Sequence, residues 1–400
     1  MLSRLYAKWM YQWETALTTR DENRIERPLE WGFDHLADFG GTEALQAIAD
    51  GETTPLEAMI ALNQRIAAEP HAFFDYVTPT DFRLEQHFPE LYPTNVRPET
   101  LEQEREWQRR AEVGELRRVP FLRFTSPIRT PYPENDTVNA RWYPAEHKDK
   151  SRPRQAMIVM PQWNADAFSH NALCTLFNRF GISCLRLSKP YHDARRPAEL
   201  ERSDYAVSAN AGRTTAACRQ AVVDIRSCVD WLAAQGYEQF GVLGTSLGSC
   251  YAFIAAAMDP RLRVCAFNHV STYFGDVVWT GQSTRHILAA FRHAGLTQEQ
   301  VRSMFVGVSP MSYMKPFAET TNRHSLIIHA TYDLTFVRKF SLDVLRNFDL
   351  HGIRYVSKVL PCGHYTTGET PYKYLDGWYM GSFVHSAFKQ LASERRDRSA

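Results

Sequence analysis

Residues 240–249 read FGVLGTSLGS, and this stretch decides which fold the sequence predicts. Its apolar start leads directly into a G-x-S-x-G sequence, and an alanine-rich run with a helical pattern, residues 252–257, follows. Where a strand turns sharply into a helix, there is no space for side chains two residues before and two residues after the turn residue. Gly244 and Gly248 occupy these two positions around Ser246. The stretch therefore predicts a strand, a tight turn that presents Ser246, and a helix.

The surrounding sequence alternates between short apolar runs and segments of helical length. The runs are too apolar to have a solvated face, which is typical of parallel strands buried on both sides. Among the helical segments, residues 214–235 have apolar side chains at spacings of three and four, and Gly236 follows as a helix end. This order predicts an α/β protein with a mostly parallel, doubly wound sheet and helices on both faces. Strands are expected at residues 156–160, 182–187, 240–243, 264–270, 326–328 and 355–360.

Composition and charge exclude several classes of protein. With 400 residues, of which 44% are hydrophobic, the chain is neither disordered, collagen-like nor a small disulfide-stapled scaffold. Lys and Arg total 46 and Asp and Glu total 45, so no global field attracts nucleic acid, and none is expected as a partner. The seven cysteines lack a CxxC pair and are expected to be core thiols. No signal-peptide or transmembrane pattern is found, and a cytoplasmic location is expected.

The first helix predicted from the sequence carries an apolar stripe that has two interpretations. Such a helix usually docks on its own domain, which is the interpretation that we favour. Because the stripe contains tryptophans, peripheral contact with a membrane interface through this N-terminal helix stays open. The stripe consists of Leu2, Leu5, Tyr6, Trp9, Met10 and Trp13.

Ser246 could act as a nucleophile if the fold supplies it with two partners. A hydroxyl is a poor nucleophile at neutral pH, so it needs a histidine as base and a carboxylate that orients the histidine. In a doubly wound sheet, these partners lie beyond the carboxyl ends of later strands. Asp333 and His364 each follow one of the last two predicted strands, in the expected chain order. Asp276, after the predicted strand at 264–270, is the alternative acid.

Other polar side chains are expected to lie in the core or on the surface without a catalytic role. His269 and His329 lie within strand-like runs and are expected to be core histidines. Arg195, Arg196 and Arg213 are expected to be solvated, with contact to an anionic substrate group as the alternative.

From about residue 121 to 392, the chain resembles an α/β-hydrolase. The resemblance rests on the G-x-S-x-G turn, an acid after the penultimate strand and Gly-His after the last strand. Within that superfamily, residues 190–197 (PYHDARRP), together with GTSLG around Ser246, are similar to the group that contains α/β-hydrolase domain-containing protein 18 and bacterial relatives. The resemblance implies that Ser246 is the nucleophile, Asp333 the orienting acid and His364 the base.

An α/β-hydrolase also needs two backbone donors that form an oxyanion hole. The N–H of Leu247, which follows the nucleophile, is expected to be one of them. The loop after the strand at 156–160 begins with Pro161, which has no N–H, so Gln162 or Trp163 is expected to supply the second. Trp163 would also narrow an acyl pocket.

The resemblance, combined with the sequence pattern, predicts four parts of the chain. Residues 1–118 are expected to be an N-terminal helical accessory region, residues 119–392 the catalytic domain, and residues 393–400 a frayed tail. Residues 273–317 interrupt the strand-helix alternation and are rich in aromatic residues and methionine, so they are expected to cap the crevice. The predicted pocket lining consists of Trp163, Tyr273, Phe274 and Trp279.

Together, these expectations predict a serine hydrolase that cleaves a carboxylic ester or a related acyl bond through an acyl-enzyme. The expected substrate is a small acyl or ester molecule, and neither a metal nor an organic cofactor is expected. An acyltransferase with the same three residues is one alternative. A noncatalytic binding module that uses the helical N-terminal region for a partner is another. The sequence leaves the substrate and the oligomeric state open.

Overall fold

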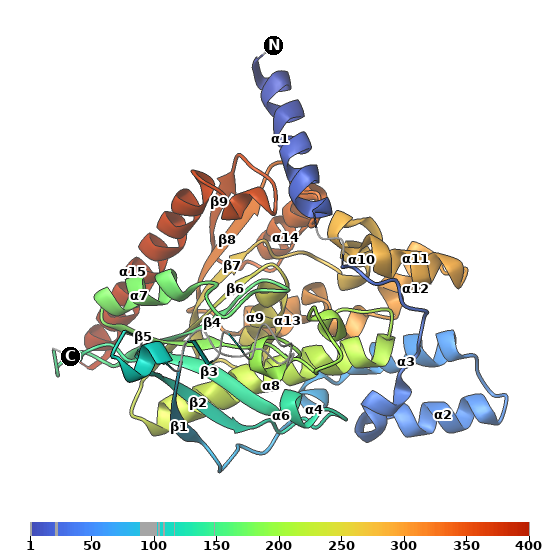
Figure 1. Cartoon of the computed structure of the whole chain (residues 1–400), viewed down its shortest axis with the longest axis horizontal. Coiled ribbons are helices and arrows are strands. Elements are labelled where there is room, and N and C mark those ends of the chain that lie inside the picture. Colours follow the sequence, from blue (N-terminus) through green and yellow to red (C-terminus); the bar gives the residue numbers. More distant parts are fainter. Residues whose placement is uncertain are drawn as a thin grey trace.

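The computed structural model describes residues 2–20, 23–88, 102, 105–106, 109–115, 117–147 and 149–399. Its described strands form one sheet in the order β1-β2-β3-β5-β4-β6-β7-β8-β9 (Figure 1). The strands from β4 to β9 pair in parallel, and β1 to β3 form an antiparallel edge. The predicted α/β class and the mostly parallel sheet are confirmed. The strands are β1 Arg83–His87, β2 Val119–Thr125, β3 Thr137–Tyr143, β4 Gln155–Met160, β5 Ile182–Leu187, β6 Gln239–Thr245, β7 Leu262–Asn268, β8 His324–Ala330 and β9 Val356–Leu360.

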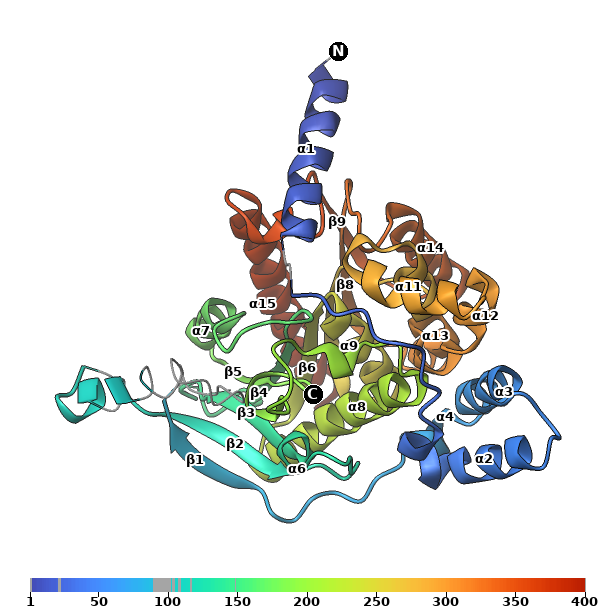
Figure 2. The same ribbon diagram turned by 45° about the vertical axis from the view of Figure 1, so that its right-hand side comes forward.

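Helices cover both faces of the sheet, with α7 and α15 on one face and α8, α9 and α14 on the other (Figure 2). Alternate residues of β4 show why both faces are buried. Ile158 packs into the core under α8 and α9, whereas Met157 and Val159 pack into the core under α7 and α15. Such strands have no solvated face, which explains their continuous apolar runs. These helices are α7 Asn171–Arg179, α8 Ala211–Ala234, α9 Leu247–Met258, α14 Arg338–Leu350 and α15 Tyr372–Ser399.

The N-terminal part of the chain is mostly helical, with one exception. β1 pairs antiparallel with β2, so residues 83–87 extend the sheet, within a region that the sequence predicted to be a helical accessory segment. This edge strand is polar and is held by charge: Arg123 of β2 donates a hydrogen bond of 2.9 Å to Glu85. A polar strand of this kind lacks the apolar alternation on which the prediction depended. The helices of this part are α1 Leu2–Thr19, η1 Phe33–Phe39, α2 Gly41–Ala49, α3 Pro55–Ala68 and α4 Pro70–Phe73.

Helix α1 projects from one end of the molecule, and its second half packs onto the sheet domain (Figures 1 and 2). Met10, Glu14 and Thr18 are fully buried. Two members of the predicted apolar stripe are not, because Leu5 is 60% and Trp9 49% exposed. Among the helices of the described residues, none has both the length and the apolar character needed to cross a membrane.

The segment between β7 and β8, which contains the residues predicted to cap the crevice, consists of short helices. Phe291, Val301, Met304 and Phe305 are buried and form much of this segment's own core. At the other end of the chain, α15 continues to Ser399, where the sequence predicted a frayed tail. All seven cysteines are buried and free, as expected of core thiols. The short helices are α10 Phe274–Thr280, η4 Gln282–Thr284, α11 Arg285–His293, α12 Gln298–Ser303, η5 Val306–Val308, η6 Pro310–Tyr313 and α13 Met314–Glu319.

Candidate active site

The turn between β6 and α9 holds Ser246 in a strained backbone conformation, with φ 55° and ψ −123°. Both flanking glycines are required by close packing. A Cβ on Gly244 would lie 2.2 Å from the carbonyl oxygen of Gly248, and a Cβ on Gly248 would lie 2.4 Å from the carbonyl oxygen of Met160. The sharp strand-to-helix turn predicted from the sequence is therefore present, and Leu247 begins the helix that follows it.

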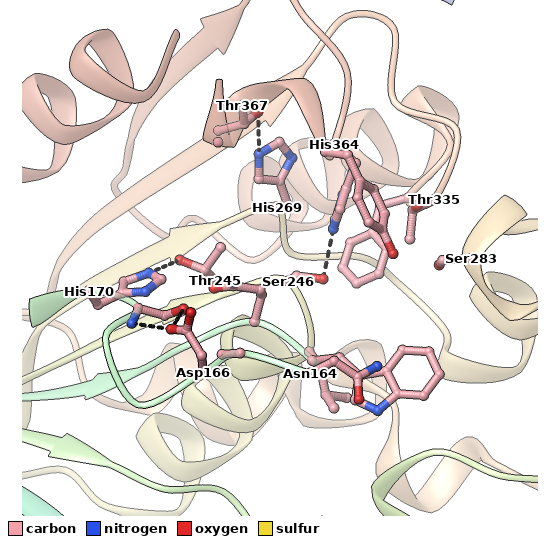
Figure 3. A pocket seen from close by; sticks show the side chains of 18 of the residues that line it. Asn164, Asp166, His170, Thr245, Ser246, His269, Ser283, Thr335, His364 and Thr367 are labelled. Atoms are coloured by element: carbon pink, nitrogen blue, oxygen red, sulfur yellow. Dashed lines mark hydrogen bonds between the residues drawn. The ribbon is translucent and has the colours of Figure 1, made fainter. Parts of the chain in front are cut away.

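Three side chains that are far apart in the sequence form a hydrogen-bonded chain at the carboxyl edge of the sheet. His364, after β9, has its Nε2 2.8 Å from Ser246 Oγ (Figure 3). The other ring nitrogen of His364, Nδ1, lies 2.8 Å from Asp333 Oδ2, after β8. The second carboxylate oxygen of Asp333 accepts hydrogen bonds from the backbone N–H groups of Thr335, at 2.8 Å, and Phe336, at 2.6 Å. The structure therefore brings together the serine, acid and histidine named from the sequence.

The negative charge of Asp333 and the positive charge that His364 takes up stabilise each other. Burial alone would lower the pKa of His364. The charge of Asp333, the hydrogen bond between Asp333 and His364, and the charge of Glu14 outweigh burial, so the pKa of His364 is raised. Burial raises the pKa of Asp333, but the charge of His364 and the hydrogen bonds from His269 and His364 hold the pKa well below its usual range. Asp333 is therefore ionised, and His364 Nδ1 donates to it. His364 Nε2 is left free to accept the proton of Ser246.

The alternative acid, Asp276, has other partners. It lies in α10, is buried, and accepts hydrogen bonds from Arg302 Nε at 3.0 and 2.9 Å and from Gln298 Nε2 at 2.9 Å. In the described part of the chain, no hydrogen bond joins Asp276 to His364. The structure therefore places Asp333, and not Asp276, beside the histidine.

Backbone donors are available next to Ser246. Leu247, Gln162 and Trp163 all line the same cavity. In the residues that the structure describes, the backbone N–H groups of these three residues have no hydrogen-bond acceptor. Leu247 also stands at the start of α9, where the helix dipole favours negative charge. These are the groups that the sequence named as donors of an oxyanion hole.

The cavity at Ser246 and His364 has a volume of about 1470 Å³. Trp163, Tyr273 and Phe274 line it, but the fourth residue predicted for the lining does not. Trp279 lies away from the cavity, with the guanidinium of Arg292 5.5 Å from the centre of its ring. The reason is helical geometry: Phe274, Val277 and Val278 of α10 line the cavity, and the next residue points elsewhere.

Comparison with known proteins shows a shared fold. Residues 167–275 match the family model described as alpha/beta hydrolase domain containing 18. The solved acetyl xylan esterase from Paenibacillus sp. R4 superposes with a TM-score of 0.53 and 10% identity, over 83% of this chain and 94% of that chain. Acetyl xylan esterase 1 from Thermoanaerobacterium sp. JW/SL YS485 superposes with a TM-score of 0.52 and 14% identity, over 80% and 93%. This chain is an α/β-hydrolase by fold.

The likeness in sequence is narrower than the likeness in fold. An uncharacterised 31.7 kDa protein of Escherichia coli, from the traX-finO intergenic region, is 33% identical over 94 residues. That match covers 22% of this chain and 32% of the relative, so the chain matches about a third of the relative's length. The resemblance to the α/β-hydrolase superfamily is confirmed. The resemblance to the domain-18 group is confirmed over residues 167–275.

The sequence did not identify His269 as a member of the candidate site. Its Nδ1 lies 3.2 Å from the same oxygen of Asp333 that His364 contacts, and its Nε2 lies 3.1 Å from Thr367 Oγ1 (Figure 3). Burial lowers the pKa of His269. The signal in the sequence was its position near the carboxyl end of the predicted strand at 264–270, at the edge where ligands bind; the observed strand β7 ends at Asn268, one residue before it. His329, by contrast, is a buried residue of β8, as expected.

His269, Asp333 and His364 also deserve consideration as metal ligands, because their candidate ligand atoms lie within 4.8 Å of one another. Both histidines use Nδ1 in a hydrogen bond with Asp333, and the remaining nitrogen of His364 contacts Ser246. The atoms that would bind a metal ion are thus engaged with one another. This donor set fits proton transfer at Ser246 better than it fits a metal site.

The PYHDARRP motif holds the loop that contains the expected oxyanion donors. Lys189, next to the motif, donates a hydrogen bond of 2.8 Å to the carbonyl oxygen of Gln162. The backbone N–H of Asn164 lies 3.1 Å from His192 Nε2, while His192 Nδ1 lies 2.8 Å from the carbonyl oxygen of Pro190. Burial lowers the pKa of both Lys189 and His192. His192 is therefore neutral, with Nδ1 as donor and Nε2 as acceptor.

Two arginines that the sequence analysis expected in solvent are buried. Arg195 forms an ion pair of 2.8 Å with Asp224, and both side chains are completely buried. Arg213 stacks on Tyr205, with its guanidinium carbon 3.8 Å from the ring centre. These expectations were wrong because each cation has a partner within the fold: Asp224 of α8 for Arg195, and the nearby ring of Tyr205 for Arg213. Arg196, the third arginine, lines the cavity.

Glu14 is a further residue that sequence reasoning missed. Its buried carboxylate accepts hydrogen bonds from the backbone N–H of Tyr365, at 2.8 Å, and from the N–H and hydroxyl of Thr366, at 2.9 and 3.0 Å. A Cβ on Gly363 would lie 2.3 Å from this carboxylate. Helix α1 therefore fixes the loop that carries His364. The only signal in the sequence was an acidic residue beside an apolar stripe.

Proposed function

We propose that this α/β-hydrolase is a serine hydrolase that cleaves a carboxylic ester or a related acyl bond of a small molecule. The observation that carries the proposal is the 2.8 Å contact between His364 Nε2 and Ser246 Oγ, on a turn strained in the way that exposes a nucleophile. The similarity in fold to two acetyl xylan esterases supports the proposal. The free, buried cysteines support the expected cytoplasmic location.

The reaction proceeds in two halves. Ser246 Oγ attacks the carbonyl carbon while His364 Nε2 accepts the hydroxyl proton, and Asp333 stabilises the imidazolium that forms. The carbonyl oxygen becomes an oxyanion, which accepts hydrogen bonds from the N–H of Leu247 and that of Gln162 or Trp163. The C–O bond to the alcohol then breaks, and His364 returns its proton to the leaving oxygen. Water, deprotonated by His364, then attacks the acyl carbon. The bond between that carbon and Ser246 Oγ breaks, His364 returns the proton to Oγ, and the carboxylic acid is released.

The side of the cavity under the cap favours an apolar acyl chain. Phe274, Val277 and Val278 of α10 line it, together with Phe336. Acyl transfer would use the same catalytic residues and replace water with an alcohol or thiol. A noncatalytic binding module would leave the hydrogen-bonded Ser246, His364 and Asp333 without a role.

Labelling with a fluorophosphonate probe tests the proposal, combined with hydrolysis of p-nitrophenyl esters with acyl chains of increasing length. The expected result is one probe adduct on the peptide that contains Ser246, and loss of both labelling and hydrolysis in Ser246→Ala. Ser283→Ala is the matched control, because Ser283 lines the same cavity and has no hydrogen bond to His364. A wild-type protein that neither labels at Ser246 nor hydrolyses any ester would contradict the proposal and favour a binding module.

A further inference from the structure

The cavity continues beyond Ser246 to a polar region on the face of the sheet opposite the cap. Helices α7 and α15 bound this region, and Leu173, Asp376 and Met380 of these helices line the cavity. The region adjoins the nucleophile directly, because the backbone N–H of Ser246 donates a hydrogen bond of 2.8 Å to the carbonyl oxygen of Asn268. The side chain of Asn268 in turn contacts Asp376, so one residue links the nucleophile to the carboxylate.

Asp376 and Asn268 have hydrogen-bonding atoms without partners. Asn268 Nδ2 donates a hydrogen bond of 2.8 Å to Asp376 Oδ2. Asp376 Oδ1 and Asn268 Oδ1 are both buried, and neither has a partner among the described residues. Asp376 is only 7% and Asn268 only 1% exposed. Leaving two buried acceptors without donors costs free energy, so a donor that reached Asp376 would relieve part of this cost.

Among the described residues, no cation forms an ion pair with Asp376, and the Asn268 amide is its one hydrogen-bond donor. His170, which bonds to Thr245 Oγ1 at 2.8 Å (Figure 3), is neutral because burial lowers its pKa to about 3. Lys373, on the same helix as Asp376, places its ammonium 5.3 Å from the ring centre of Tyr374. Burial raises the pKa of Asp376 to about 7, against the opposing hydrogen bond from Asn268. A ligand that donates a hydrogen bond, or carries a positive charge, would therefore be held by this carboxyl group.

We propose that Asp376, positioned by Asn268, forms a specificity subsite that binds a hydrogen-bond donor of the substrate, a hydroxyl or a primary ammonium group. The inference rests on the proposed hydrolase function and defines its substrate class. The apolar chain lies under the cap, and the donor lies on the other side of the scissile bond, toward α15. The free oxygen of Asp376, which lines the cavity, accepts from that donor, and Asn268 holds the other oxygen in place. A substrate without such a group leaves the free oxygen of Asp376 unpaired and is discriminated against.

Three matched esters test the subsite: octanoates of 4-ethylphenol, 4-(hydroxymethyl)phenol and 4-(aminomethyl)phenol, together with their 3-substituted isomers. These substrates share the acyl group and differ only in the donor. In the wild-type protein, kcat/KM for the hydroxymethyl or aminomethyl ester is expected to exceed that for the ethyl ester by about tenfold, the value of one buried hydrogen bond. Asp376→Leu is expected to reduce that ratio to about one.

A second variant separates the two kinds of donor. Asp376→Asn still accepts a hydrogen bond but has no charge, so it is expected to keep a preference for the hydroxyl ester and to lose that for the ammonium ester. Because it is nearly isosteric, it also carries the test if Asp376→Leu does not fold. Glu369→Gln is the control, since it changes another carboxylate that lines the cavity and is expected to keep the wild-type ratios.

Two results would overturn the subsite: a wild-type ratio near one for both donor esters in every isomer, or unchanged ratios in Asp376→Leu and Asp376→Asn. Failure of the proposed function looks different. In that case, none of the esters is hydrolysed, and the fluorophosphonate probe does not label Ser246 in the wild-type protein. Labelling of Ser246 with no discrimination between the esters contradicts the subsite alone.

Discussion

The carboxylate of Glu14, in the first helix of the chain, is buried against the backbone N–H of Tyr365, the residue that follows His364. This contact joins segments that are 351 positions apart. It makes α1 part of the candidate active site, because the helix both holds the histidine loop and places a negative charge near the imidazole. A region without a recognisable motif thus supports the base of the proposed reaction.

Glu14→Gln is expected to move the acid limb of the pH profile to lower pH. The charge of Glu14 raises the pKa of His364, and His364 must be neutral to accept the serine proton. Removing the charge lowers this pKa, so activity persists at lower pH. The measurement is kcat/KM for a p-nitrophenyl ester against pH, with Glu43→Gln in α2 as the control. An unmoved limb, or one displaced to higher pH, would refute a direct influence of Glu14 on His364.

Replacing each of the two candidate acids by the corresponding amide shows which one is the catalytic acid. Asp333→Asn is expected to lower kcat by about 10⁴, because the amide no longer stabilises the imidazolium or fixes the correct tautomer of His364. Asp276→Asn is expected to weaken the ion pair with Arg302 and lower the free energy of unfolding, with a much smaller effect on kcat. Kinetics and urea denaturation of both variants check this. The assignment is wrong if Asp276→Asn is the more damaging change to kcat.

His192→Ala is expected to loosen the loop that contains Gln162 and Trp163. The variant removes the acceptor for the N–H of Asn164, so the oxyanion donors lose their fixed positions. Loss of one such donor costs about 10² to 10³ in kcat, with less effect on KM. His192→Gln, which offers an oxygen as acceptor, should recover part of the rate. If both variants instead raise KM and leave kcat unchanged, His192 supports substrate binding and not the oxyanion hole.

Gly248→Ala is expected to lower both the free energy of unfolding and the rate of ester hydrolysis. The added methyl group would lie 2.4 Å from the carbonyl oxygen of Met160 and 2.5 Å from that of Pro161, where the backbone has to move. Overpacking of this kind costs about 1 to 3 kcal/mol. Thermal unfolding and ester hydrolysis are the measurements, with Gly352→Ala in an open turn as a reference for backbone strain alone. A stable, fully active Gly248→Ala would contradict the packing described for this turn.

The central strands and the serine turn could be predicted because their signals are local. Each strand is an uninterrupted apolar run, and the turn needs glycine at two fixed positions around Ser246. The order of Asp333 and His364 follows from the way in which parallel strands end at one edge of a sheet. These features depend on neighbouring residues and on a general rule of topology.

The parts that could not be predicted depend on contacts between distant segments. β1 is a polar strand that exists because Glu85 meets Arg123 across the sheet edge. Glu14 and Asp376 belong to helices at opposite ends of the chain, and nothing beside them in the sequence indicates the loop or the cavity that they reach. The burial of Arg195 likewise depends on Asp224, a residue of another element.

The most direct test of the proposed acyl-enzyme mechanism is to trap the covalent intermediate during turnover. The wild-type protein is mixed with p-nitrophenyl octanoate, quenched with acid within the first turnover, digested and analysed by mass spectrometry. If Ser246 is acylated during turnover, we expect an octanoyl group on Ser246 and a burst of p-nitrophenol that Ser246→Ala abolishes. Steady hydrolysis without acylated Ser246, or hydrolysis that persists in Ser246→Ala, would contradict it.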